Sequence, residues 1–546
     1  MGVSSSVEQQ VPNEERVVEN RAASMGSLPM LRDAFSKLAD PLTNLIPLNS
    51  FERCLGLEYN GVIFECVDAG KDDLQHSSLL NCVGPSIVEL FFKAENAGVN
   101  WVEFVKGYLR CCQMVPASIS LNALFRVFAM ASRKAGIPTN FDVHSTTDEE
   151  NELDELIIDC KLCGSLETGD ILKFFLMCWT LDWSFLNPTS IEPKQSLFLP
   201  DLYHLLASAV TLCVEETGGD NLLSLSNWKV SNLTAQMPVG KFHFWVSATL
   251  PSLSDCFGHF VDMRLRRCCS ALGVGTTSQD KLSIMKYPYL LSLGRAWAVS
   301  LTLQDPVKSE VMKAFIANDG KEDEHNLLYR SSTHGRGLNR LWANLEGYHG
   351  PLLILVSAAL EGDKENDRWI LGARTEKGLE NKDDFYGNSG ILYAIYPIFH
   401  VFSPTGKEKN FIYSHFRSSK RAYEPHPKPV GLAFGGSISK ERVYIDEDFA
   451  RVTIRHHAVD KTYRPGSLFP SQGYLPVEAL ILEVEVWGLG GVRSKNEQNS
   501  YKKREDLFTE QRRKVDLKSF ANWEDAPEKI MMDMMSDPNK VSREAR

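Results

Sequence analysis

Apolar residues follow two different spacings along this chain of 546 residues. From 29 to about 275 they recur three and four positions apart, as in Leu31, Phe35 and Leu38, which places them on one side of a helix. From 322 to 491 the spacing falls to two, in short runs that glycine, proline and charged residues separate. The pattern therefore predicts an α+β protein, in which a mostly helical N-terminal half precedes an antiparallel two-sheet β-sandwich and a C-terminal helix.

The remaining regions differ in composition from these two halves. Residues 1–28 are polar and rich in Ser, Glu and Gln, which predicts a disordered leader. Residues 276–321 are expected to connect the helical half, 29–275, to the strand-rich domain, 322–491. Residues 492–546 interleave charged and apolar side chains, so we expect them to form a charged helical tail.

Charge and cysteine content exclude several classes of protein. The net charge is −11, and no segment carries the basic excess of a dedicated nucleic-acid binder, so no nucleic-acid partner is expected. No apolar run is long enough to span a bilayer, and the N-terminus lacks the basic start and apolar core of a secretory signal. A cytoplasmic protein is therefore expected. Its 12 cysteines are interpreted as buried, reduced thiols.

The first six residues match the acceptor pattern for N-myristoylation, with Gly2 as the acceptor and Ser6 at the required position. One myristoyl chain gives only marginal and reversible membrane binding. The leader has neither a cysteine nor a basic cluster that could provide a second anchor. We therefore expect a lipoprotein that lies on the cytosolic face of a membrane, reached through its myristate, with a protein partner as the second attachment.

The strand-rich region contains a series of short motifs that could carry a functional surface. It opens with LLYRSSTHGRGLNRLW and continues through PLLILV, WILGA, YAIYP, GLAFGG, YIDED and VEVWG. Within these motifs the residues of interest are Ser332, His334, Gly335, Gly372, Gly435, Gly436, Asp446, Glu485 and Trp487.

In this order, the motifs resemble the TLDc family, the domain of the eukaryotic oxidation-resistance proteins, over about a third of the chain. One departure is a short glycine-rich loop, in which Ser437, Ile438 and Ser439 follow Gly436. A myristoylated branch of the family has the same layout: an acceptor glycine, an EF-hand-like helical half, a TLDc domain and a C-terminal helix. The resemblance implies a lysosomal or vacuolar surface and subunits of the vacuolar proton pump (V-ATPase) as partners.

The EF-hand likeness of the helical half is one of shape. If Gly98 is the sixth residue of a loop, Lys93 is the first and Phe104 the twelfth. A calcium loop needs oxygen ligands at both places, so we expect a degenerate EF-hand that binds no calcium. Cys160 and Cys163 have the spacing of half a zinc site, but no second pair follows, and no metal site is predicted.

The motif residues are interpreted as structural or docking residues, and no catalytic residue or cofactor is predicted. Glu485 lies on an alternating strand and needs hydrogen-bond partners if it is buried. Gly435 and Gly436 are expected to serve a turn that needs positive φ or a close backbone approach. Ser332 with His334, and the pair His456 and His457, are the best candidates for hydrolytic chemistry, but no nucleophile elbow accompanies them.

The end of the tail carries an apolar stripe. A helix there would place Ile530, Met531, Met534 and Met535 on one face, after Trp523. Methionine side chains are flexible, so this face suits a partner groove. It could equally pack back onto the strand-rich domain, and the sequence leaves both alternatives open.

Three readings of the function remain. The first is a non-enzymatic, membrane-associated TLDc adaptor or regulator, acting on the V-ATPase or in oxidative-stress resistance, at the vacuole or lysosome or at the plasma membrane. The second is a TLDc enzyme of oxidative defence with Ser/His/Glu chemistry. The third is a nuclear or nucleolar regulator that uses two basic clusters of the tail, Lys502–Arg504 and Arg512–Lys514, although a solvated helix face explains such clusters more commonly.

Overall fold

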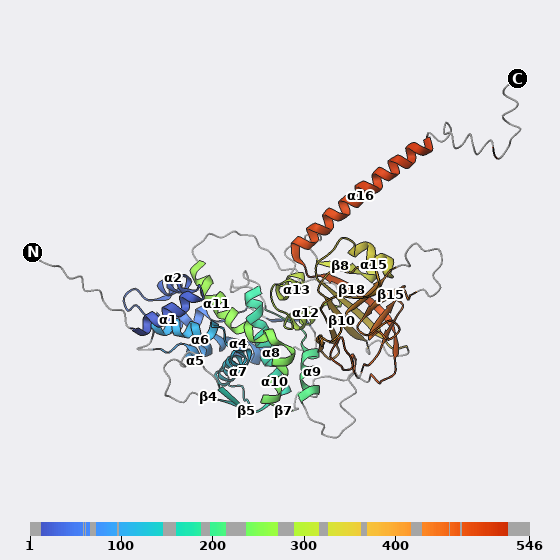
Figure 1. Cartoon of the computed structure of the whole chain (residues 1–546). Helices are drawn as coiled ribbons and strands as arrows, with labels where there is room; N and C mark the ends of the chain where they lie inside the picture. Colours follow the sequence, from blue (N-terminus) through green and yellow to red (C-terminus); the bar gives the residue numbers. More distant parts are fainter. Residues whose placement is uncertain are drawn as a thin grey trace, which may run out of the picture.

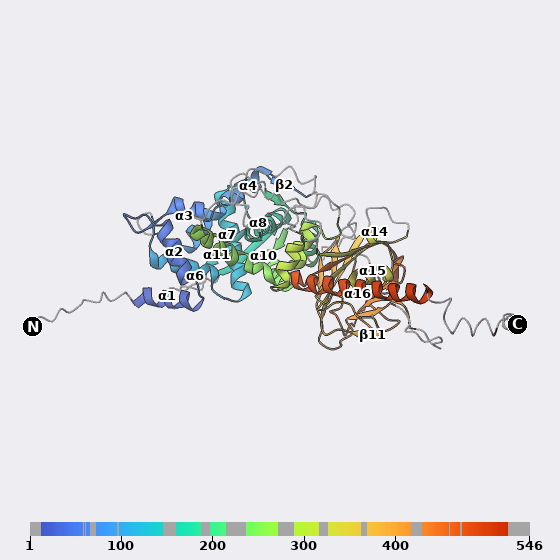
Figure 2. The same cartoon turned by 90° about the horizontal axis from the view of Figure 1, so that it is seen from above.

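The computed structural model contains a helical half and one large antiparallel sheet that lie side by side (Figure 1). Helix α1 lies at one end of the molecule and helix α16 at the other, in both this view and the view from above (Figure 2). The structure describes residues 13–57, 59, 62–65, 73–94, 98–145, 160–186, 197–213, 236–270, 289–315, 326–361, 368–416, 428–457, 459–469, 472–521 and 535.

The expected helical half is confirmed as a set of packed amphipathic helices. In α8, for example, Phe174, Phe175 and Trp179 are all fully buried, as the spacing of three and four predicts. The helices are α1 (Asn13–Ser24), α2 (Leu28–Leu38), α3 (Leu48–Cys54), α4 (Asp73–Asn81), α5 (Val83–Phe91), α6 (Trp101–Cys112), α7 (Ala117–Lys134), α8 (Thr168–Leu186), α9 (Tyr203–Cys213), α10 (Val239–Thr249) and α11 (Asp255–Ser270).

Short strands connect several of these helices. Strand β1 (Ile46–Pro47) pairs with β3 (Gly98–Val99), and β2 (Val62–Phe64) pairs in parallel with β6 (Leu197–Leu199). A small sheet joins β4 (Phe141–Ser145), β5 (Cys160–Glu167) and β7 (Gln236–Pro238).

Part of the expected leader is helical. Helix α1 begins at Asn13 and buries Val18 and Ala22, while Lys106 of α6 pairs with Glu14. The apolar side chains supply the packing that a disordered leader lacks. Gly2 lies outside the described residues.

Two helix–loop–helix units, α2–α3 and α5–α6, are joined through their loops by the β1–β3 pair. Asn100 caps α6 by accepting a hydrogen bond from the backbone N–H of Glu103 at 2.9 Å, and Phe104 is fully buried. The acidic residue of the first turn is thus Glu103, whose carboxylate lies 3.3 Å from the ammonium of Lys106 and 3.5 Å from the guanidinium of Arg110.

The strand-rich region forms an antiparallel sheet of 11 strands, counted over the described residues. The strand order is β11-β14-β15-β16-β17-β18-β9-β10-β12-β13, with β8 paired to β18. The strands are β8 (Leu327–Arg330), β9 (Leu352–Ala359), β10 (Trp369–Thr375), β11 (Lys382–Tyr386), β12 (Gly390–Tyr396), β13 (His400–Phe402), β14 (Ile412–His415), β15 (Gly431–Phe434), β16 (Val443–Asp446), β17 (Arg451–Ile454) and β18 (Val477–Gly488).

This sheet curls so that β13, at one end of the strand order, comes close to residues next to β16 and β17. The guanidinium of Arg442, before β16, lies 4.5 Å from the ring centroid of Phe402 in β13, although the two strands are far apart in the strand order. Pro404 also bridges to Tyr463. The α+β class and the antiparallel β layers are therefore confirmed, and the two layers are halves of one hydrogen-bonded sheet.

Strand β9 is buried on both faces. Ile354 and Val356 point into the space that the curled sheet encloses, whereas Leu353 and Leu355 join the core of the helical half. Burial on both faces explains why β9 is apolar at every position except Ser357, a pattern that strands buried on both sides adopt.

Short helices connect and extend the sheet. Helices α12 (Leu293–Ser300) and α13 (Val307–Phe315) lie between the helical half and the sheet (Figure 1). Helices α14 (Ser331–His334) and α15 (Leu338–Leu345) follow β8, and α16 (Gly491–Ala521) follows β18. No single helix among the described residues is long and apolar enough to span a bilayer, and α6 with α7 would suffice only together, with a bend of 114° between them.

A buried ion pair fixes the loop that closes the curled sheet. The guanidinium of Arg442 donates to Asp460 at 2.9 Å and to the carbonyl oxygens of Arg464, at 2.7 Å, and Gly466, at 2.8 Å. Asp460 accepts from the backbone N–H of Thr462 at 2.8 Å. Both charged side chains are almost completely excluded from solvent, so the pair holds its loop only as long as each charge keeps its partner.

We expect Arg442→Met to lower the free energy of unfolding by about 3–5 kcal/mol, because Asp460 would remain buried without its cation. The matched control is Arg451→Met, which removes an exposed arginine paired with Glu478 and should cost no more than about 1 kcal/mol. Denaturant unfolding of the two variants measures both values. Equal stability of the two variants would contradict a structural role for the buried pair.

Candidate functional site

Two glutamates of β18, Glu483 and Glu485, organise the end of the sheet next to the helical half. They lie two positions apart, so their side chains share one face of the strand, as the alternation predicts. Arg330 of β8 lies opposite Glu485 in the register and places its Nε atom 3.5 Å from both carboxylates. A single cation therefore serves two acidic side chains.

Glu485 is fully buried and accepts hydrogen bonds from a distant segment. Its Oε1 atom accepts the backbone N–H of Leu290 at 2.9 Å, and its Oε2 atom accepts the indole N–H of Trp487 at 3.1 Å and the N–H of Leu291 at 3.4 Å. Burial raises the pKa of Glu485 above its usual value, although these donors and Arg330 oppose the shift. The side chain thus ties the sheet to the segment that precedes α12.

Glu65, after β2, accepts hydrogen bonds from the next residues of the same segment. Its carboxylate accepts the N–H groups of Leu293 at 3.0 Å and Gly294 at 3.4 Å, which form the first turn of α12. It also accepts the N–H of Asp201 at 2.8 Å. Burial raises the pKa of Glu65 as well. A carboxylate at the N-terminus of a helix satisfies backbone donors that have no partner within the helix.

Aromatic and cationic side chains enclose this connection, which we call the carboxylate clasp (Glu65, Glu485 and residues 290–294). The ring of Tyr289 packs edge-on against Trp487, with 5.6 Å between centroids, and Arg330 lies 4.9 Å from the centre of the Tyr289 ring. Tyr289 and Trp487 therefore shield the hydrogen bonds of Glu485 from water.

The predicted pair Ser332 and His334 does not assemble as a nucleophile and its base. His334 accepts the backbone N–H of Arg330 at its Nδ1 atom, at 2.9 Å, and its ring stacks on Tyr329. Ser332 is exposed, and its backbone N–H donates to Glu483 at 2.8 Å. The two side chains thus stabilise the turn after β8.

The buried serine of this turn is Ser331, which the sequence analysis missed together with Glu483 and Arg330. The hydroxyl of Ser331 donates to Glu483 and accepts the N–H of Val484 at 3.0 Å. Burial by itself raises the pKa of Glu483, but the hydrogen bonds from Ser331 and Ser332 outweigh it and lower the pKa. The strand alternation around Glu485 was a signal that could have identified Glu483.

The glycines of the motifs occupy positions where a side chain does not fit. Gly435 and Gly436 have φ of 68° and 87°, and a Cβ atom on Gly436 would lie 2.3 Å from the carbonyl oxygen of Lys440. A Cβ atom on Gly372 would lie 2.7 Å from a side-chain atom of Ile395 in the neighbouring strand.

Two further motif residues hold turns. Gly335 has φ of 87° and accepts the hydroxyl of Tyr329 at its carbonyl oxygen, at 2.7 Å. The carboxylate of Asp446 accepts the N–H groups of Ala450 at 2.8 Å and Arg451 at 3.1 Å, and so closes the turn between β16 and β17.

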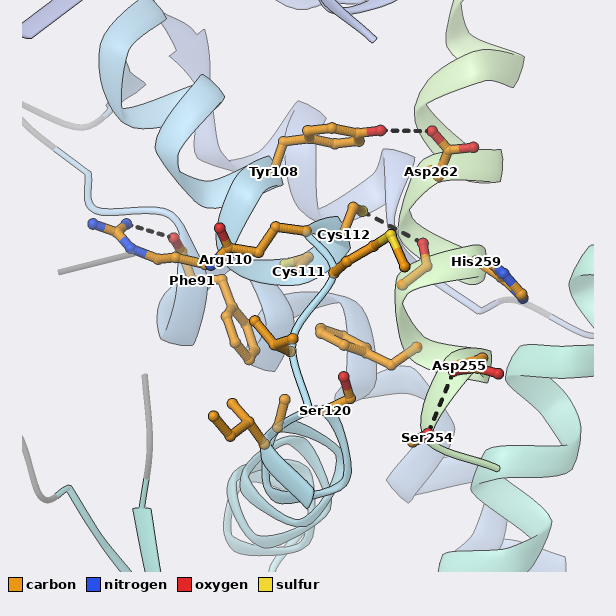
Figure 3. A pocket seen from close by; sticks show the side chains of 17 residues that line it. Phe91, Tyr108, Arg110, Cys111, Cys112, Ser120, Ser254, Asp255, His259 and Asp262 are labelled. Atoms are coloured by element: carbon orange, nitrogen blue, oxygen red, sulfur yellow. Dashed lines mark hydrogen bonds between the residues drawn. The ribbon is translucent and has the colours of Figure 1, made fainter. Parts of the chain in front are cut away.

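A pocket of about 370 Å³ opens between α6, the start of α7 and α11 (Figure 3). Its polar groups bond to one another: Tyr108 donates to Asp262 at 2.8 Å, and the thiol of Cys112 donates to the carbonyl oxygen of Gly258 at 3.4 Å. Burial raises the pKa of Cys112, which keeps this thiol protonated at neutral pH. This chemistry indicates no ligand class.

The remaining site residues that the sequence predicted belong to the C-terminal tail. Trp523, Ile530, Met531 and Met534 lie outside the described residues, and Met535 is 83% exposed. Over the part of the chain that the structure describes, no group of three or more His, Cys, Asp or Glu side chains could hold a metal ion.

We expect Glu485→Gln to lower the free energy of unfolding by about 1–3 kcal/mol. The amide NH₂ of glutamine would replace one carboxylate oxygen and would then face an N–H group, of the backbone or of the Trp487 indole, that has lost its acceptor. Glu478→Gln, an exposed position on the same strand, is the matched control. Thermal unfolding of both variants, with limited proteolysis around residue 290, measures the effect. Unfolding of Glu485→Gln at the control's temperature would show that the clasp contributes nothing to stability.

Comparison with known proteins agrees with this architecture. The sequence model of the TLDc domain family matches residues 301–490 of this chain. This region begins directly after α12 and ends directly before α16. A search of curated proteins found no match to the chain. The matched region contains the complete large sheet and all the motif residues from Ser332 to Trp487. The chain is therefore a TLDc-domain protein.

Proposed function

We propose that this chain is a non-enzymatic TLDc adaptor, which docks onto a membrane-associated assembly through α16 and the residues beyond it. The observation that carries this proposal is the position of α16, which leaves the sheet and extends away from the rest of the molecule (Figure 1). The V-ATPase is the leading candidate for the assembly, since the resemblance to the TLDc family implies it, and a role in oxidative-stress resistance is the broader family function.

Only the first turns of α16 are anchored, among its described side chains. Gln498 donates to the carbonyl oxygen of Asn344 at 2.7 Å, and Tyr501 donates to Glu346 at 3.2 Å. The ring of Tyr501 also packs against Gly347, where a Cβ atom would lie 2.5 Å away. These contacts fix the direction in which the helix leaves the domain.

The next part of α16 is exposed from Lys503 to Lys514. Leu507 and Phe508 are 58% and 57% exposed within it. Adjacent large apolar side chains on a projecting helix are the type of anchor that a partner groove receives. Their exposure supports docking by this helix, together with the methionine stripe that the sequence places further along.

The hydrogen bonds around Ser331 support a non-enzymatic role. Its hydroxyl contacts the carboxylate of Glu483 directly, whereas a serine nucleophile needs a base that can take its proton at neutral pH. The lowered pKa of Glu483 makes this carboxylate a weak base. The arrangement is that of a structural turn.

The proposed docking is tested by affinity purification from membranes with the full chain as bait. We expect Leu507→Asp with Phe508→Asp to remove V-ATPase subunits from the captured material, because two charges would replace the apolar anchor. Thr509→Asp with Gln511→Asp adds the same charges at exposed polar positions of the same helix and should leave capture unchanged. Met531→Asp with Met534→Asp tests the stripe in the same way.

The melting temperature of each variant separates docking from folding. Loss of capture at an unchanged melting temperature supports the proposal. If the Leu507 and Phe508 variant still captures the pump subunits, or if its melting temperature falls sharply with capture intact, α16 is not the docking element.

We propose that Gly2 carries the myristoyl group and that the chain lies on the cytosolic face of the vacuolar or lysosomal membrane. The paired helix–loop–helix units support this assignment, since the myristoylated branch of the family has an EF-hand-like helical half. We expect Gly2→Ala to move the chain from membrane to soluble fractions, because the acyl chain contributes about 0.8 kcal/mol per buried CH₂. Fractionation measures the shift, and a non-acylated N-terminus in mass spectra of the wild-type chain would exclude the proposal.

A further inference from the structure

Two cysteines from distant parts of the sequence meet at the surface of the helical half. Cys54 is the last residue of α3, and Cys268 lies in the last turn of α11. The sulfur of Cys54 lies 4.0 Å from the carbonyl oxygen of Arg264, one turn before Cys268 in α11, and both cysteine side chains are partly exposed. The two thiols are therefore neighbours, close enough to interact. The packing of α3 on α11 therefore holds two sulfur atoms together at an accessible position.

The charges around this pair favour a thiolate at Cys268. The hydrogen bond from Cys54 lowers the pKa of Cys268, and the guanidinium of Arg264 and the ammonium of Lys37 act in the same direction, against the effect of burial. From α2, Lys37 is itself paired with Asp33 at 3.1 Å, and Asp33 contacts the neighbouring Cys269. A thiolate is the form of cysteine that reacts with peroxides and disulfides.

Other thiols in the described part of the chain lack this combination. Cys178 and Cys256 also contact each other, but both are fully buried in the core. Burial raises the pKa of Cys111 and Cys112 beside the pocket of Figure 3. Contact between two thiols, partial exposure and neighbouring cations thus coincide at Cys268.

We propose that Cys54 and Cys268 form a redox-modifiable pair, in which a hydroperoxide oxidises Cys268 and Cys54 resolves the product to a disulfide. In the first step the Cys268 thiolate attacks one peroxide oxygen; an S–O bond forms, the O–O bond breaks, and the leaving alkoxide or hydroxide takes up a proton. The sulfur becomes a sulfenic acid and the peroxide is reduced to an alcohol and, for hydrogen peroxide, to water.

In the second step the sulfur of Cys54 attacks the sulfenic sulfur. The S–S bond forms and the S–O bond breaks, while the hydroxide that leaves combines with the proton of the Cys54 thiol to give water. A thiol reductant of the cytosolic type reverses the reaction by exchange. The bridge links α3, in the first helix–loop–helix unit, to α11, which packs against α2, α6 and α8. Oxidation would therefore fasten that unit to the rest of the helical core.

The full chain is tested with stoichiometric hydrogen peroxide, followed by blocking of free thiols and digestion without reduction. We expect mass spectrometry to find one dominant linked peptide that joins Cys54 to Cys268. Before oxidation, Cys268 should be alkylated at neutral pH roughly tenfold faster than Cys163, a partly exposed cysteine of β5. Cys163→Ser is the matched control and should leave the linkage unchanged.

Two variants assign the roles within the pair. In Cys54→Ser the linked peptide should disappear and a cyclic diketone probe should trap a sulfenic acid on Cys268. In Cys268→Ser both the linkage and the label should be absent. Labelling of Cys54 in Cys268→Ser would reverse the roles and overturn the proposal. Absence of the linkage in the wild-type chain, or its equal distribution over other cysteines, would also overturn it, and this test needs no variant to fold.

Discussion

The backbone N–H groups between Leu290 and Gly294 are the donors on which the arrangement of the two halves depends. They lie where the chain passes from helices to sheet, and a buried donor without an acceptor costs about 1–3 kcal/mol. Glu485 supplies the acceptor from the sheet and Glu65 from the helical half. Because each carboxylate is buried for this purpose, its pKa is raised, and the N–H donors are what make the buried charge tolerable. If either half moved away from this segment, one of the two carboxylates would lose its N–H donors.

The carboxylate clasp also explains why one face of the large sheet is apolar. Leu353, Leu355 and Trp487 belong to the core of the helical half, so this face of β9 and β18 is an internal surface. The TLDc match begins at residue 301, after the clasp. The region that matches the TLDc family therefore does not include α12, which covers the sheet in this chain. The helical half completes the domain because it buries the apolar face of the sheet. The partner surface that we propose therefore lies elsewhere, on the projecting helix.

Local pattern was sufficient for most of the helical half, for the strands of the large sheet and for part of the site, but not for helix α1 in the predicted leader. The spacing of apolar residues predicted the helices and the strands, and alternation placed Glu485 beside Trp487 on one strand face. Pairings across long separations were beyond such reasoning, because nothing near Glu65 or Glu485 in the sequence indicates that both bond to the 290–294 segment. The same holds for Cys54 and Cys268, which only the packing of α3 on α11 brings close together. In the loop before α6, the spacing around Gly98 did not predict that Asn100 caps the helix.

Helix α16 shows how a domain can present a surface that its own core does not stabilise. Its 31 residues would span about 45 Å at 1.5 Å per residue, far more than the few turns held by Gln498 and Tyr501. Pairs four residues apart, such as Lys514 with Glu510 at 2.8 Å, contribute only about 0.2–0.5 kcal/mol each. A helix without packing on an apolar face is marginal in water even when its sequence favours it. The anchored turns act as a nucleus for the exposed ones, and a partner that buries Leu507 and Phe508 would supply the packing energy that the sheet does not.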